Sequence, residues 1–94
     1  MSVYVITWNL NKERQNYDTA RRAFIQHLER YDNTKDSGLE SVRWISTTST
    51  AEQVQNDLQA KLDGNDRLFV SKLTSGNHQG WLSKQVWEWI NARL

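Results

Sequence analysis

The sequence contains no cysteine and no proline. Without cysteine the chain can form neither disulfides nor thiolate metal sites, so it is not a disulfide-stapled secreted domain and suits a reducing compartment. The opening residues, MSVYVITWNL, lack the basic segment and the apolar stretch of a signal peptide. No apolar run approaches the roughly 20 residues that a membrane helix needs. We therefore expect a cytoplasmic protein with no membrane partner.

The sequence also lacks an excess of either charge. Its 12 Lys and Arg residues are balanced by 11 Asp and Glu residues, which leaves a formal net charge of +1. Strong nucleic-acid binders usually carry a basic excess or a basic stripe. Any such binding must therefore come from local placement of cations or from dimerisation. The 94 residues fit a single domain, 1–94, with a thin margin of stability.

Tryptophan, by contrast, is plentiful, with five residues in the chain. Because indole is costly to leave in water, most of the five are expected in the core or at an interface. Three of them fall within the last fourteen residues. A helix that is aromatic on two sides has more apolar surface than one sheet covers, which favours an interface over simple core packing. The predicted interface residues are Trp81, Trp87, Trp89 and Ile90.

Hydrophobic periodicity predicts strands that alternate with helices. Strands are expected at residues 3–8, 39–47 and 67–73, and helices at 17–31 and 83–94. Between these lies a helix that begins at a capping box formed by Ser49 and Glu52 and is ended by Gly64. The turn-rich stretch 32–38 is either a loose second strand or a loop.

This order predicts an α+β fold, namely a ferredoxin-like βαββαβ sandwich with an additional C-terminal helix at about 83–94. Two helices between strands lie on one face of the sheet through right-handed crossovers. The third helix could cover a sheet edge, swap onto a partner or close the open face.

Several short segments point to a family. They are VYVITWNLN, a loop that ends in NYD, VRWIS, TSTAEQV, GNDRLFVSKLT and GWLSKQVWEWI. Together they resemble short bacterial and phage proteins that are grouped with the small subunit of the CRISPR spacer-integration complex. The resemblance implies a ferredoxin-like fold, usually in dimers whose two sheets face one another. It also implies metal-dependent nuclease activity in some members and a structural platform for DNA in others.

One position departs from this family at a residue that matters for metal chemistry. The relatives have an aspartate at the end of the first strand, proposed to hold the metal, whereas this sequence has Asn9. Asparagine is neutral and a weaker ligand for hard cations such as Mg²⁺. We therefore expect no catalytic residue, metal or cofactor, with Mg²⁺ or Mn²⁺ needed only if nuclease activity remains.

The loop after the first strand offers amides and cations beside Trp8 that could contact phosphates or bases. Two arginines in the following helix could extend this basic strip. The predicted nucleic-acid-binding residues are Asn9, Asn11, Lys12, Arg14, Arg21 and Arg22. The alternative is an ordinary solvated surface, because Glu13, Asp18 and Glu29 dilute the positive charge.

The remaining titratable residues give weak signals. His27 is expected to flank the apolar stripe of the first helix. His78 lies in a loop near Ser75 and Asn77, but a lone histidine without a fixed carboxylate or nucleophile is poor evidence for acid–base catalysis. The carboxylates that lie in turns are expected to accept hydrogen bonds from backbone donors rather than to bind metal. These are Asp32, Asp36, Asp63 and Asp66.

These observations favour a non-catalytic scaffold domain, homodimeric, that binds nucleic acid or another protein and takes no small-molecule substrate. Two alternatives stay open. One is a divalent-metal-dependent endoribonuclease or endonuclease with a degenerate metal site. The other is a phage or plasmid protein that binds a host defence complex.

Overall fold

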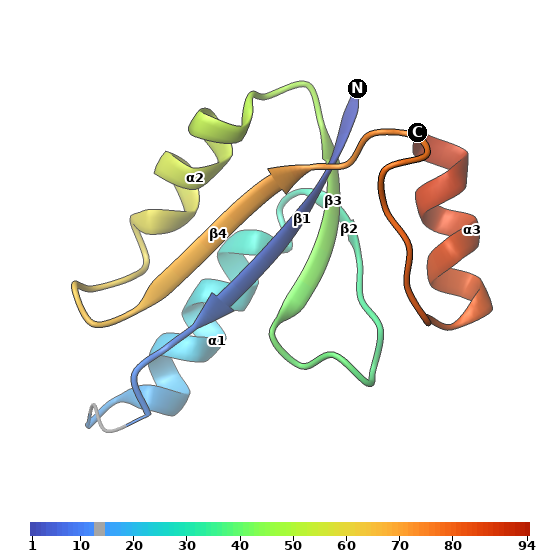
Figure 1. The fold of residues 1–94 in the computed structure, drawn as a ribbon. Helices are drawn as coiled ribbons and strands as arrows, with labels where there is room; N and C mark the ends of the chain where they lie inside the picture. The colour runs from blue at the N-terminus through green and yellow to red at the C-terminus, as the bar shows by residue number, and fades with distance from the viewer. Residues whose placement is uncertain (13–14) are drawn as a thin grey trace.

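The elements follow the order β1 α1 β2 β3 α2 β4 α3 in a computed structural model, which describes residues 1–12 and 15–94 (Figure 1). Their bounds are β1 Ser2–Asn9, α1 Tyr17–Leu28, β2 Asp32–Thr34, β3 Val42–Thr47, α2 Ala51–Gln59, β4 Arg67–Lys72 and α3 Lys84–Arg93. The strands form one four-stranded sheet in the order β2-β3-β1-β4, with every neighbouring pair antiparallel. The chain is thus an α+β protein, as predicted, and its architecture is compatible with a ferredoxin-like fold.

Helices α1 and α2 cover one face of the sheet. Successive side chains of a strand point to opposite faces, and Tyr4, Ile6 and Trp8 of β1 point toward these helices. They join a buried cluster with Phe24 and other apolar residues of α1 and α2. The rings of Trp8 and Phe24 lie 5.2 Å apart at an interplanar angle of 52°. This cluster is the main core, and the predicted apolar stripe of the first helix supplies one side of it.

Helix α3 lies on the opposite face, apart from α1 and α2 (Figure 1). Val86 and Ile90 of this helix pack in a second buried cluster with Val3, Trp44 and Leu73. Of the three placements considered for this helix, the structure has the one in which it closes the open face of its own sheet.

The closure is incomplete, because α3 packs against one half of that face. On the other half, the side chains of Thr7 and Asn9 in β1 and of Arg67 and Phe69 in β4 are exposed. We call these four residues the open strip. They alternate with the core residues of their strands, so they lie on the face that α3 shares.

Two predicted boundaries at the β2 side are wrong. Helix α1 ends at Leu28 and not at residue 31, and β3 begins at Val42 and not at residue 39. The residues before β3 form a tight turn in which Asp36 accepts a backbone hydrogen bond from Leu39 of 2.9 Å and its side chain accepts one from Gly38 of 2.8 Å. This turn separates β3 from the short β2, so the loose-strand alternative for residues 32–38 is confirmed in part.

The predicted ends of α2 are also wrong. The capping box is formed by Thr50 and Gln53, one residue later than predicted, with reciprocal bonds of 3.1 and 2.8 Å. The sequence allows the box to start at either Ser49 or Thr50, because both are followed by a suitable residue three positions later. In the structure the Ser49 carbonyl accepts a 2.7 Å hydrogen bond from the Tyr4 hydroxyl, and Thr50 is the N-cap. The helix ends at Gln59, before Gly64, because Leu58 and Gln59 accept tight i+3 bonds from the following residues.

None of the helices in residues 1–12 and 15–94 has the length and apolar character that crossing a membrane requires.

Candidate functional site

The open strip combines one aromatic ring with polar and cationic side chains. Thr7 of β1 is paired directly with Phe69 of β4, and Asn9 is paired with Arg67. Residues opposite each other on antiparallel strands have Cβ atoms about 4.5–5.5 Å apart, so the four side chains form one contiguous patch. Phe69 is 63% exposed. A phenyl ring held on a sheet but left in water is available to stack on a flat ligand.

Hydrogen bonds to neutral carbonyl groups hold the Arg67 side chain in place. Its guanidinium donates to the backbone carbonyls of Gly64 at 3.2 Å and Asp66 at 2.9 Å. Within the described ranges it forms no ion pair with a carboxylate. Arg67 and Phe69 line one shallow hollow, and the Arg67 guanidinium at its edge is directed to carbonyl oxygens of the turn before β4.

A buried carboxylate holds the ends of β1 and β4 together beneath this patch. Asp66 is 6% exposed and accepts hydrogen bonds from the backbone of Asn11 at 2.8 Å and of Asp63 at 3.0 Å. Asp63 in turn accepts one from the backbone of Asn65 at 2.9 Å. The prediction that these two carboxylates serve backbone donors is confirmed. The buried Asp66 thereby positions the strand ends, and the exposed Asp63 orders the turn before β4.

The described residues among those predicted to bind nucleic acid are divided between two regions of the molecule. Asn9 lies in the open strip, and Lys12 is exposed in the loop that follows β1. The backbone of Asn11 is tied to Asp66. Arg14 lies outside the described residues.

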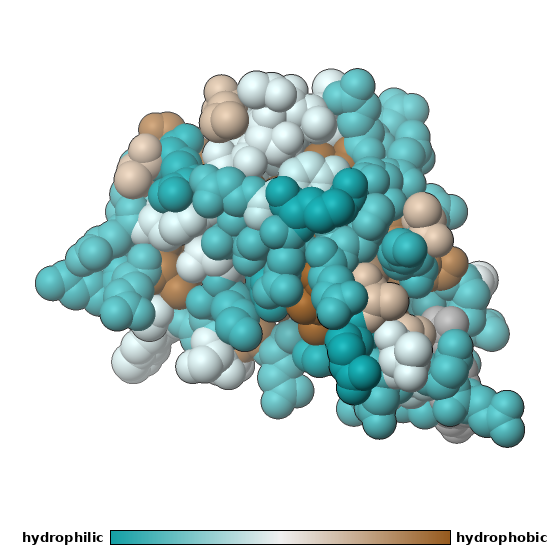
Figure 2. Space-filling view, turned by 180° about the vertical axis from the view of Figure 1, so that it is seen from behind, coloured by the Kyte–Doolittle hydropathy of each residue, from teal (hydrophilic) through white to brown (hydrophobic). Residues whose placement is uncertain are grey.

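The two arginines of α1 lie on the side of the sheet that α1 and α2 cover, and not on the side of the open strip. Arg21 and Arg22 line a shallow hollow of about 470 Å³ together with Asp18 and Glu29. A second hollow, of about 530 Å³, combines Arg21 with Arg43 and further charged residues of both signs. Figure 2, which views the molecule from behind, shows a mainly hydrophilic face with small hydrophobic areas between polar side chains. The balance of charges in these hollows gives an anionic ligand little net attraction.

Arg43 is a buried charge that the sequence did not single out as a paired residue. It is 5% exposed and bonds to Glu29 at 3.1 Å and to the amide oxygen of Asn33 at 2.8 Å. The pairing joins β3 to β2 and α1. Because its charge is compensated, Arg43 is a structural residue in this arrangement.

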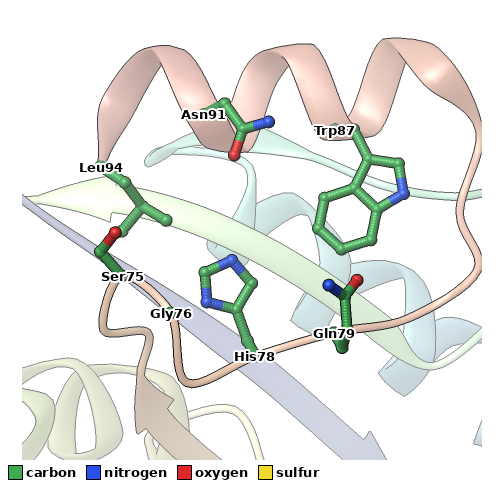
Figure 3. Close-up of a pocket in the computed structure, with 7 residues that line it drawn as sticks. All are labelled: Ser75, Gly76, His78, Gln79, Trp87, Asn91 and Leu94. Atoms are coloured by element: carbon green, nitrogen blue, oxygen red, sulfur yellow. The ribbon is translucent and has the colours of Figure 1, made fainter.

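The loop after β4 forms a polar hollow against α3 (Figure 3). Its volume is about 480 Å³. His78 projects from the loop toward the helix, where Trp87 and Asn91 point back at it (Figure 3). The His78 ring stacks near Trp87 at 6.2 Å, and its Nδ1 lies 3.0 Å from the carbonyl oxygen of Thr74. Among the described residues, no Asp or Glu side chain lines this hollow, so no carboxylate side chain is placed to act with His78 in acid–base chemistry.

A cluster that links α1 to α2 was missed from the sequence. His27 Nε2 lies 2.9 Å from the backbone oxygen of Asp57 and 3.1 Å from its Oδ1. The Tyr31 hydroxyl donates to Asp57 Oδ2 at 2.6 Å, and Arg30 contacts the same oxygen. His27 thus does more than flank the apolar stripe. The contact joins residues about 30 positions apart, which helical periodicity does not reveal.

The titration of this cluster follows from its contacts. Burial raises the pKa of Tyr31 to about 12, and the hydrogen bond to the Asp57 carboxylate acts in the same direction. Burial also raises the pKa of Asp57, but the Tyr31 hydrogen bond and the charges of His27 and Arg30 outweigh it and lower that pKa overall. The cluster therefore favours an ionised Asp57 beside a neutral Tyr31, which suits a structural clasp between the helices.

The other two carboxylates predicted to lie in turns, Asp36 and Asp32, have different partners. Asp36 accepts backbone bonds from Gly38 and Ser83, both of 2.8 Å, and the one from Ser83 is the leading cause that lowers the Asp36 pKa. This confirms the prediction for Asp36. The prediction is wrong for Asp32, the first residue of β2, whose Oδ2 pairs with Arg93 of α3 at 2.8 Å.

The site carries no ready set of metal ligands. In the part of the chain that the structure describes, no group of three or more His, Cys, Asp or Glu side chains could hold a metal ion. No protein-family model matches the sequence, and no curated protein matches it either.

Proposed function

We propose that this chain is a non-catalytic scaffold domain that binds single-stranded nucleic acid across the open strip. The observation that carries the proposal is the 63% exposed ring of Phe69 in a hollow that it shares with Arg67, whose guanidinium pairs with no carboxylate among the described residues. Aromatic rings stack on bases regardless of sequence, and arginines bind phosphates. Asn9 and Thr7 add hydrogen-bonding groups at the same patch.

The shape of the patch favours a single strand over a duplex. The four side chains, on two neighbouring strands, line an open, shallow hollow of about 200 Å³. Unpaired bases can lie on such a surface, whereas the bases of a duplex are stacked inside it. One stacked base contributes roughly 1–3 kcal/mol, so we expect weak binding. The single cation of the open strip should give it the shallow salt dependence of one phosphate contact.

The fold supports the finer assignment proposed from the sequence. The strand order β2-β3-β1-β4 with antiparallel neighbours is the arrangement that a ferredoxin-like βαββαβ unit requires, with α3 added after β4. We propose that the chain is related to the small subunit of the CRISPR spacer-integration complex, on the DNA-platform side of that family. Asn9 in place of the strand-end aspartate supports a role without turnover.

Binding of labelled short oligonucleotides, followed by fluorescence anisotropy at several salt concentrations, tests the proposal. We expect single strands to bind more tightly than duplexes. Phe69→Ala should weaken binding about tenfold or more, since it removes a stacking partner. Arg67→Ala should weaken it and reduce the slope of log affinity against log salt by about 0.7, the contribution of one phosphate contact. Leu94→Ala, which trims another exposed apolar side chain, is the matched control.

Three outcomes would overturn the proposal. Absence of binding at low salt would leave a protein partner, including a host defence complex. Equal binding by wild type and both strip variants would place the contact elsewhere. Cleavage that requires Mg²⁺ or Mn²⁺ and disappears in Asn9→Ala would favour the nuclease alternative.

A further inference from the structure

Aromatic side chains from three segments of the chain line a hollow of about 420 Å³ between α3 and the sheet. Trp44 comes from β3, Trp87 from α3, and His78 and Trp81 from the loop that joins β4 to α3. Trp44 is 6% exposed, whereas Trp81 is completely exposed. We call this space the aromatic hollow. Its volume falls in the range of about 300–1,000 Å³ that ligand sites occupy.

The walls of the aromatic hollow are suited to a cation. No charged side chain lines it among the described residues. The face of an aromatic ring is partially negative, and indole attracts cations most strongly among the side-chain rings. Trp89 of α3 already holds a cation in this way, since the Arg93 guanidinium lies 4.1 Å from its ring. In the described part of the chain, no Arg or Lys lies over the three indoles of the hollow.

A carboxylate lies beside the wall of the aromatic hollow. The Asp36 side chain accepts a backbone bond of 2.8 Å from Ser83, which follows the wall residue Leu82. The Asp36 carbonyl accepts one of 2.9 Å from Leu39, another wall residue. Bonds from the backbone of Ser83 and Gly38 lower the pKa of Asp36, so its side chain is ionised at neutral pH. This negative charge favours a cationic ligand over a neutral or an anionic one.

The polar hollow of Figure 3 adjoins the aromatic hollow, because His78, Gln79 and Trp87 line both. His78 Nδ1 is the donor in its contact with the Thr74 carbonyl, since a carbonyl oxygen only accepts. In the neutral ring, Nε2 is then an acceptor. The ring is directed toward α3, where Asn91 also points into the polar hollow (Figure 3). A ligand group that donates a hydrogen bond therefore suits this side.

We infer that the aromatic hollow binds a small alcohol that carries a methylated ammonium group, for which choline is the probe. The ammonium head lies against the three indoles, and the hydroxyl reaches His78 in the polar hollow. Methyl groups on the nitrogen contact the apolar walls while the charge attracts the ring faces. The ligand is bound and not converted, because no carboxylate side chain stands beside His78. The inference is independent of nucleic-acid binding, since it uses the α3 half of the face and not the open strip.

This site gives a role to three of the four residues predicted to form an interface. Trp81 and Trp87 are walls of the aromatic hollow, and Ile90 lines it at 1% exposure. Trp89 contributes within its own chain, through its contact with Arg93. A bound cation thus accounts for the exposed indole of Trp81 without a protein partner.

Titration with choline chloride, followed through the indole N–H signals in NMR spectra of the full chain, tests the inference. Single Trp→Phe variants assign the five signals. The signals of Trp81 and Trp87 should shift with a dissociation constant on the order of 1 mM, as expected for a ligand of few atoms. The signal of Trp8, which belongs to the main core, should stay in place.

Two relatives of choline separate the contribution of charge from that of shape. Dimethylbutanol, in which carbon replaces the charged nitrogen, should bind at least about tenfold more weakly because it loses the attraction to the rings. Glycine betaine keeps the head but ends in a carboxylate that only accepts, so it should also bind more weakly. Equal binding of the neutral alcohol would overturn the inference. So would tighter binding of a trimethyl-lysine peptide than of choline, because the ligand would then be a protein.

Variants of the rim residue provide a second test. Trp81→Ala should weaken choline binding at least about tenfold, and Trp81→Phe should fall between Ala and wild type because a phenyl ring attracts cations less than indole. Trp81 is completely exposed, so both variants should fold as the wild type does, which circular dichroism verifies.

Phe69→Ala is the matched control, since Phe69 is exposed on the same face outside the aromatic hollow. It should weaken oligonucleotide binding and leave choline binding unchanged, which keeps failure of the two proposals distinguishable. The inference is overturned if Trp81→Ala binds choline as the wild type does, if Phe69→Ala loses choline binding, or if no indole signal shifts at choline concentrations far above the expected dissociation constant.

Discussion

The two faces of the sheet differ in how fully helices cover them. On the face of α1 and α2, the alternating β1 residues Tyr4, Ile6 and Trp8 are all buried. On the face of α3, Val3 is buried, Val5 is half-buried and Thr7 is exposed. One strand therefore passes from core to surface along a single face. The difference indicates that the first face contributes more buried core and that the second leaves part of its surface exposed.

Removing one phenyl ring from each face should give the largest difference in stability between the two faces. Phe24→Ala empties a fully buried site and should lower the free energy of unfolding by about 3–5 kcal/mol. Phe69→Ala removes the same side chain from the open strip and should change it by less than about 0.5 kcal/mol. Urea denaturation of both variants measures the difference, and equal losses would contradict the assignment of the faces.

A further variant tests how much the contact between α3 and the sheet contributes to the stability of the protein. Ile90→Ala removes a buried contact between α3 and the sheet and should cost about 2–5 kcal/mol. Because the second cluster is smaller, we expect hydrogen exchange to accelerate in α3 more than in α1. Uniform acceleration in all helices would show that the two clusters unfold as one unit.

The smallest effect concerns the clasp between the helices of the first face. The pKa of Tyr31 is about 12 in the folded protein, against an ordinary value of 10.0. Between these two pH values the folded state therefore binds more protons than the unfolded state. The free energy of unfolding should therefore fall as pH rises from about 10 to about 12. Tyr31→Phe should lose about 1–2 kcal/mol at neutral pH and show less of this alkaline decline. If the stability of Tyr31→Phe declines with pH as steeply as that of the wild type, other titrating groups cause the decline.

Much of the fold is predictable from the sequence, because periodicity reports which residues of an element are buried. Phe24 and Leu28 show this for α1, and both are fully buried as the spacing predicts. Boundaries are less predictable. Ser49 and Thr50 satisfy the same capping pattern. Two tertiary and local contacts distinguish them, since the Tyr4 hydroxyl bonds to the Ser49 carbonyl and the Ser49 N–H donates to the Thr47 hydroxyl.

The candidate site is less predictable, because it depends on strand register and on partial coverage. Asn9 is identified from its place at a strand end, but its neighbour Arg67 is distant in sequence and is brought there by the β1–β4 pairing. The exposure of Phe69 has no local signal, since buried strands have the same composition. It follows from the position of α3, whose Val86 and Ile90 pack on other residues of this face and leave Phe69 uncovered.

The most direct test of the central claim is a backbone NMR titration with a short single-stranded oligonucleotide. We predict that amide shifts concentrate at Thr7, Asn9, Arg67 and Phe69 and decrease with added salt. Shifts centred on Arg21 and Arg22 of α1, with the open strip unchanged, would contradict the account.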